Sequence, residues 1–149
     1  MTTEVLPTHT PALFAAAVKR AAELLLAGEV VALPTETVYG LAANALDEKA
    51  VAKIFQIKGR PANNPIIVHV AGNEMAKGCV NTWPELAGKL SKAFWPGPLT
   101  LVLPRAEKIL EVIGAPINEV GGHAVRVNEV VDAPADFADQ TFHAVQLRL

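Results

Sequence analysis

Short apolar runs alternate with longer segments of helical pattern along most of this chain. The runs are rich in Val, Ile and Leu and are bounded by Pro or Gly, as strands are. Strands are expected at residues 29–33, 66–70, 99–103 and 124–127, and helices at residues 12–27, 47–57, 82–94 and 105–113. The consecutive valines of the first run favour a strand buried on both faces. This alternation predicts an α/β fold with a largely parallel or mixed sheet and flanking helices.

Local signals fix several of the expected helix ends. Thr10 precedes a proline and suits the N-cap of the first helix, and Gly28 is placed to end it. Asp47 suits the N-cap of the second helix. Thr82 and Glu85 have the spacing of a capping box for the third helix.

Composition narrows the class of protein. The 149 residues fit a single domain, and 51% apolar residues with a mean hydropathy of +0.29 fit a well-buried core. A net charge of −2 gives no general attraction to nucleic acid. The single cysteine, Cys79, excludes an internal disulfide and a cysteine-built metal site. No signal peptide or membrane-spanning run is seen, so a cytoplasmic protein without membrane contact is expected.

The segment from Pro34 to Leu41 places two hydroxyls just beyond the first expected strand. Ligands of open α/β sheets collect beyond strand ends, and Thr35 and Thr37 suit an amino or carboxyl group. Gly40 allows close approach of the backbone or a sharp turn. The same residues also fit a strand-to-helix connection with capping threonines, and residue types alone leave both interpretations open.

A second polar segment, residues 58–65, joins two cations to two amides. Lys58 offers a mobile point charge and Arg60 a planar fork, a pair suited to a polyphosphate, and Asn64 adds an amide. The spacing is not that of a Walker A loop. The alternative to a phosphate site is a structural role: the two cations would favour the C-terminus of a helix, and the asparagines would form a turn after it.

Two polar residues stand inside apolar strand patterns. His69 lies in the second expected strand, where a packed or edge histidine is as compatible as a ligand contact. It has no metal-ligand spacing with His9, His123 or His143, so no metal site is expected. Arg126 needs either a salt-bridge partner or an anionic ligand.

Three stretches together resemble the threonylcarbamoyl-AMP synthase family, the YrdC-like domain. They are "PTETVYGL", "KGRPANNPIIVHV" and "FWPGPLTLVLP", in that order, and the likeness runs from about residue 13 to about residue 127. The resemblance implies a twisted sheet with an open, positively lined concave cleft. It implies a nucleotidyltransferase that condenses L-threonine, bicarbonate and ATP, with Mg²⁺, into threonylcarbamoyl-AMP and pyrophosphate. A tRNA-modifying transferase complex would then use the product to make threonylcarbamoyladenosine in tRNA.

The resemblance also implies roles for particular side chains. Threonine would contact Thr37, His69 and Arg126, and ATP would contact Lys58, Arg60 and Asn64. Charge that builds at the α-phosphorus would be stabilised by Lys58 and Arg60, the two expected catalytic residues. No side-chain nucleophile is required.

The chain departs from the family after its "VRV" segment. The family continues with a Ser-x-Asn motif that helps to hold both substrates, whereas the one serine here is Ser91, in an expected helix. Residues 1–128 are therefore predicted as the YrdC-like domain and residues 129–149 as a divergent or truncated tail with no clear strand or helix. Impaired catalysis is expected. Two alternatives are a double-stranded RNA or tRNA-binding module, which needs Lys53, Lys58 and Arg60 on one face, and an inactive remnant of the family.

Overall fold

The computed structural model describes residues 3–34, 39–59, 66–109, 113, 115–117, 122–129 and 144–148. The helices are α1 (Pro11–Leu26), α2 (Glu48–Lys58), α3 (Asn73–Cys79) and α4 (Glu85–Phe94). The strands are β1 (Val31–Leu33), β2 (Gly40–Asn44), β3 (Ile67–Val70), β4 (Leu101–Pro104), β5 (Ala115–Ile117), β6 (Gly122–Glu129) and β7 (Ala144–Arg148). Within these ranges no helix combines the length and the apolar character needed to cross a membrane.

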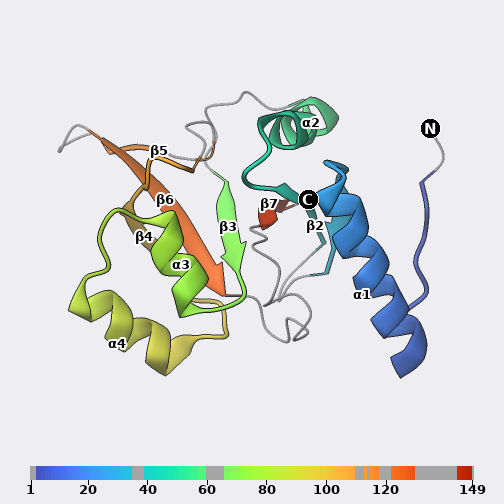
Figure 1. Cartoon of the computed structure of the whole chain (residues 1–149), viewed down its shortest axis with the longest axis horizontal. Coiled ribbons are helices and arrows are strands. Elements are labelled where there is room, and N and C mark those ends of the chain that lie inside the picture. Colours follow the sequence, from blue (N-terminus) through green and yellow to red (C-terminus); the bar gives the residue numbers. More distant parts are fainter. Residues whose placement is uncertain are drawn as a thin grey trace.

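The described strands form one mixed sheet, as the sequence predicts. Its order is β1-β2-β7-β3-β6-β4, and β5 pairs with the beginning of β6. β3 and β6 are parallel, and every other described pair is antiparallel. The α/β fold class is therefore confirmed (Figure 1).

The last strand, β7, lies in the middle of the sheet, between β2 and β3 (Figure 1). The expectation that residues 129–149 contain no strand is therefore wrong for Ala144–Arg148. A period-two alternation of Val145 and Leu147 with Gln146 and Arg148 is the signal that marks this strand in the sequence. The division of the chain at residue 128 stays a prediction.

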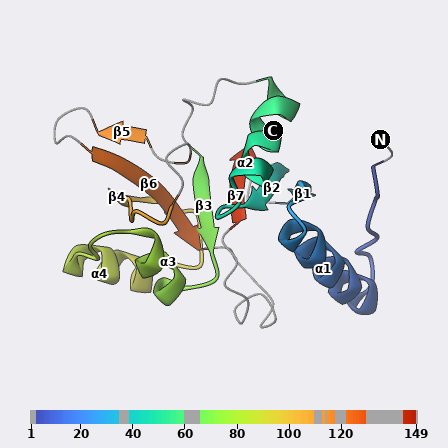
Figure 2. The same cartoon turned by 45° about the horizontal axis from the view of Figure 1, so that its top comes forward.

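Helices cover both faces of the sheet, at different places. Ala43 of β2 packs in the main core with α2 and α3, whereas its neighbour Ala42 packs with Leu25 of α1. Successive strand residues point to opposite faces, so α1 and α2 lie on opposite sides of β2. Figure 2 shows α1 at one end of the molecule and α3 and α4 at the other. The main core joins Val51, Ile54, Phe55, Val68, Val70, Ala76, Cys79, Val125 and Val127, among others.

Three of the four expected helix ends are confirmed. The Thr10 side chain accepts a hydrogen bond from the Leu13 amide at the start of α1. Asp47 caps α2 in the same way. Gly28, with φ of +77°, follows the end of α1. The capping box is wrong: α4 begins after Pro84, and no side chain caps it.

Other expectations are corrected by the way the sheet is built. β1 is a half-buried strand at one end of the sheet order, not a strand buried on both faces. Gly40 begins β2, so residues 34–39 join two antiparallel strands and not a strand to a helix. The helix expected at residues 105–113 is wrong for residues 105–109, where Arg105 forms an isolated β-bridge with Val80 and residues 107–109 form a turn and a bend. The Arg105 guanidinium donates to the carbonyl oxygens of Ala106 and Ile109.

Candidate functional site

Each of the two polar segments predicted to bind substrates precedes a strand, and these strands, β2 and β3, begin at the same end of the sheet. β1 ends at Leu33, which pairs with Gly40, the first residue of β2. β2 and β3 are both antiparallel to β7, so they run in the same direction and begin at this end. α2 connects β2 to β3, and such a crossover returns the chain to the end where both strands start. Residues 34–39 and the segment after α2 therefore meet the sheet at one end.

This end is the amino end of β2 and β3. Ligands were expected beyond the carboxyl end of the first strand, as in a parallel sheet. The carboxyl end of β1, at Leu33, does lie here. Because β1 and β2 are antiparallel, however, the same end of the sheet holds the amino ends of β2 and β3. The hairpin, not a parallel α/β unit, brings the threonine-containing segment to this position.

Lys58 occupies the last turn of α2 and is half-buried. Gly59 follows it in the left-handed conformation, with φ of +59°, and its amide donates to the carbonyl oxygens of Phe55 and Gln56. This helix end directs the chain out of α2 toward the start of β3. Thr37, Arg60 and Asn64 lie outside the described residues, so their positions stay predictions.

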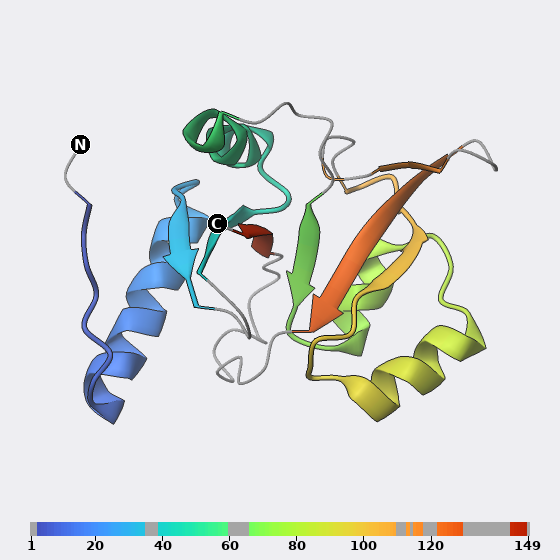
Figure 3. The same cartoon turned by 180° about the vertical axis from the view of Figure 1, so that it is seen from behind.

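His69 lies on the face of β3 that points away from the main core. Val68 and Val70 are fully buried beneath α2 and α3, whereas Ile67 and His69 are half-buried on the other face. Val102 of β4 belongs to the same face and is 61% exposed. Figure 3 views β3 and β6 from this side, with α3 behind them. We call this face of β3, β6 and β4, which lies opposite the main core, the open face.

Strand register relates position 126 to His69. Arg126 pairs with Ile67, and Asn128 pairs with His69, across the parallel β3–β6 pair. Val125 and Val127 are fully buried, so alternation assigns position 126 to the open face. His69 and position 126 thus occupy neighbouring strands on one face, one diagonal step apart.

Register also brings two positions to this face that the sequence analysis did not select. Asn128 pairs with His69, and Gln146 of β7 pairs with Ile67. The signal for Gln146 is the alternation within residues 144–148, and the signal for Asn128 is its two-residue spacing from Arg126.

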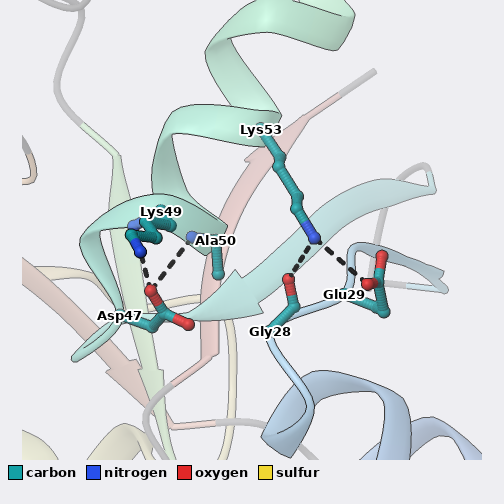
Figure 4. Close-up of polar contacts among 6 residues, drawn as sticks. All are labelled: Gly28, Glu29, Asp47, Lys49, Ala50 and Lys53. Carbon is teal, nitrogen blue, oxygen red and sulfur yellow. Dashed lines mark hydrogen bonds and ion pairs between the residues drawn. The ribbon is translucent and has the colours of Figure 1, made fainter.

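A polar contact holds α2 against the junction between α1 and β1. The Lys53 Nζ atom donates to the Gly28 carbonyl oxygen at 2.8 Å and lies 3.1 Å from Glu29 Oε1 (Figure 4). The Asp47 side chain accepts hydrogen bonds from the amides of Lys49 and Ala50. These bonds fix the start of α2, the helix that carries Lys58 at its other end.

Cys79 is a packing residue and not part of the site. Its thiol is fully buried, donates to the Met75 carbonyl oxygen, and has a pKa raised to about 12 by burial. At neutral pH it is therefore protonated and a poor nucleophile. Within the described residues, no group of three or more His, Cys, Asp or Glu side chains is placed to hold a metal ion.

Comparison with known proteins assigns the family. Residues 23–129 match the Sua5/YciO/YrdC family, whose description reads "Telomere recombination". The chain belongs to the Sua5/YciO/YrdC family. Threonylcarbamoyl-AMP synthase of Pyrococcus abyssi is 52% identical over 103 residues, 69% of this chain and 30% of that protein. The enzyme of the same name from Bacillus subtilis is 50% identical over 102 residues, 68% of this chain and 28% of that protein.

A solved structure supports the same assignment. Pyrococcus abyssi Sua5 complexed with L-threonine superposes with a TM-score of 0.74 at 41% identity, over 87% of this chain and 37% of that one. This member of the Sua5/YciO/YrdC family thus has the family's fold in its described residues. The chain spans less than a third of the length of these two curated relatives.

Proposed function

We propose that this protein is a threonylcarbamoyl-AMP synthase: a nucleotidyltransferase that condenses L-threonine, bicarbonate and ATP and releases pyrophosphate. The observation that supports the proposal is that β2 and β3, the strands that follow the two polar segments, run in the same direction and begin at one end of the sheet. The supporting comparisons are the family match over residues 23–129, which include both segments, and the 52% identity over 103 residues to a threonylcarbamoyl-AMP synthase.

The ATP phosphates would lie at the end of α2. Lys58 in the last turn, with Arg60 and Asn64 after it, would hold the phosphates through charged and amide hydrogen bonds. Attack on the α-phosphorus adds negative charge to its oxygens, and fixed cations lower that cost. Lys58 and Arg60 would therefore act as electrostatic catalysts, without a covalent intermediate on the protein.

Threonine would bind on the open face. Arg126 would pair with its carboxylate, and His69, one diagonal step away, would contact its polar groups together with Thr37. With the amino group between this face and the phosphates, its carbamate would be directed toward the α-phosphorus. The proposed order of the site is thus threonine over β3 and β6, then bicarbonate, then ATP.

Mg²⁺ would enter with ATP. Magnesium bound to nucleotides keeps several waters and takes its other ligands largely from the phosphates. The phosphate oxygens of ATP would therefore be the main donors to this ion. The product would pass to a tRNA-modifying transferase complex in the cytoplasm.

The rate would be lower than that of a family member with the Ser-x-Asn motif. Ser91, the chain's one serine, is buried in α4, where its hydroxyl donates to the Gly88 carbonyl oxygen. It therefore cannot replace the missing motif. In this chain the strand after the "VRV" segment is β7, which lies between β2 and β3. Its polar position 146 pairs with Ile67 of the open face.

Calorimetric titration tests the substrate set without requiring turnover. L-Threonine and a non-hydrolysable ATP analogue with Mg²⁺ should each bind the folded protein. Lys58→Ala should weaken binding of the analogue but leave threonine binding unchanged. Lys49→Ala, which removes an exposed lysine from the other end of the same helix, is the matched control and should change neither. A folded protein that binds neither ligand would contradict the proposal.

A further inference from the structure

We propose that Lys53 is a positioning residue: it fixes the helix that carries Lys58, and so sets the affinity for the nucleotide without touching it. This inference rests on the proposed function. It concerns a residue outside the segments assigned to substrates, in the middle of α2.

Lys53 makes two contacts with the α1–β1 junction. Its ammonium group donates to the Gly28 carbonyl oxygen at 2.8 Å and to Glu29 Oε1 at 3.1 Å (Figure 4). One acceptor is backbone, whose position the fold determines, and the other is a partly exposed side chain. The backbone contact therefore fixes the geometry, and the carboxylate adds charge pairing.

The junction that Lys53 binds is itself held in place. The Gly28 amide donates to the Leu25 carbonyl oxygen and the Glu29 amide to that of Leu24, which is the Schellman arrangement at a helix end. Gly28 is buried, and β1 begins two residues after Glu29. Lys53 thus ties α2 to a point fixed by both α1 and β1.

α2 packs against the main core through Val51, Ile54 and Phe55, and Lys53 adds a polar contact between the middle of the helix and the α1–β1 junction. Asp47 caps its first turn, and Lys53 lies about one and a half turns further along. Lys58 follows Lys53 by five residues, or about 7.5 Å along the helix axis. Without the Lys53 contact, only apolar packing would hold the body of α2 in place, and a tilt of the helix would displace its far end most. Lys53 therefore limits the movement of Lys58 and of the segment that follows it.

A merely stabilising ion pair would behave differently. An exposed pair of this kind contributes little to the free energy of unfolding. If that were its whole role, Lys53→Met would leave the ligand affinities of the folded protein unchanged. A positioning role instead predicts a selective loss of nucleotide affinity, with threonine affinity preserved because the open face of β3 and β6 does not depend on α2 alone.

The test compares Lys53→Met with Lys53→Arg and with Lys49→Met. Lys53→Met should raise the dissociation constant of the ATP analogue by about two- to thirty-fold, the range found for residues that act on a site without touching its ligand. Lys53→Arg can still donate to both acceptors and should restore affinity. Lys49 is exposed in the first turn of α2 and bonds to Asp47 through its backbone amide, which the substitution keeps (Figure 4), so Lys49→Met should bind as the wild type does.

Hydrogen exchange gives a readout that does not depend on ligand. In Lys53→Met, the amides of residues 56–59 should exchange several-fold faster, whereas those of β3 should be unchanged. Equal exchange and equal analogue affinity in wild type and Lys53→Met would overturn the positioning role and leave the proposed function intact. A wild type that does not bind the analogue would overturn both.

Discussion

A Cβ atom placed on Gly28 would lie 2.8 Å from Oδ2 of Asp47, so the end of α1 directly contacts the residue that caps α2. Gly28 also has a positive φ of +77°, which ends α1 and turns the chain into β1. One glycine thus meets two requirements, a left-handed backbone and close approach to a neighbouring helix. A side chain at position 28 would therefore press on the residue that caps α2, the helix that carries Lys58.

Gly28→Ala should lower the free energy of unfolding by more than the roughly 1 kcal/mol that a left-handed alanine costs. Chemical denaturation measures the loss. Gly59→Ala has a similar positive φ but no atom within 4 Å of the added Cβ, so it isolates the backbone cost. Gly72→Ala, with extended backbone and open space, should cost least. Equal losses at Gly28 and Gly59 would show that the contact with Asp47 carries no penalty.

Asp47→Ala should destabilise the protein by about 1 kcal/mol, because it leaves two amides at the start of α2 without their acceptor. Thr10→Ala is the matched cap substitution on α1, where one longer bond of 3.3 Å is lost. It should cost less. Urea unfolding of both variants checks the order, and a larger loss for Thr10→Ala would contradict it.

Cys79 should be inert to a thiol reagent at pH 7.5 in the folded protein and react at once after unfolding. Burial raises its pKa from 9.0 to about 12, so the folded state holds the thiol proton more tightly than the unfolded chain does. The contribution to stability is complete below pH 9 and is lost as the pH rises toward 12, at up to about 1.4 kcal/mol per pH unit.

The control for this pH dependence is Cys79→Ala. The difference in free energy of unfolding between wild type and variant should shrink as the pH rises from 9 to 11, because only the wild type carries this titration. A difference that stays constant across that range would show that the thiol is not the group responsible.

His69→Ala should weaken threonine binding several-fold and leave binding of the ATP analogue nearly unchanged. His69 is half-buried on the open face of β3, away from the end of α2. Calorimetry with each ligand measures the split. His9→Ala, in the exposed segment before α1, removes a histidine outside the proposed site and serves as the control. A loss confined to the nucleotide would contradict the proposed arrangement.

The parts of the fold that depend on local sequence signals were predictable from the sequence. Thr10, Gly28 and Asp47 mark helix ends through backbone chemistry that needs no tertiary context. The strand at residues 66–70 was also evident, because its β-branched residues suit a buried sheet.

The missed elements depend on pairing partners. β2 reads Gly-Leu-Ala-Ala-Asn, a sequence with little strand propensity, and it becomes a strand because β1 and β7 pair with its two edges. Its small alanines allow helices to approach from both faces. β7 has an alternating pattern, but it follows a stretch without a period, and its place between β2 and β3 cannot be deduced from local signals.

The candidate site was predictable in composition but not in layout. The sequence selects Lys58 and His69 as residues that packing does not explain, and it places both in the expected kinds of element. Their relation to Arg126 comes from register between β3 and β6, which are separated by more than fifty residues of chain. Long-range pairing of this kind cannot be deduced from the sequence of any short segment.

Pyrophosphate release tests the central claim most directly. The folded protein, with ATP and Mg²⁺, should release pyrophosphate only when both L-threonine and bicarbonate are present, and Lys58→Ala should reduce the rate at least tenfold. Omission of either substrate should return the signal to that of a blank. Release that is equal with and without threonine, or no release from a folded sample that contains all three substrates, would contradict the assignment.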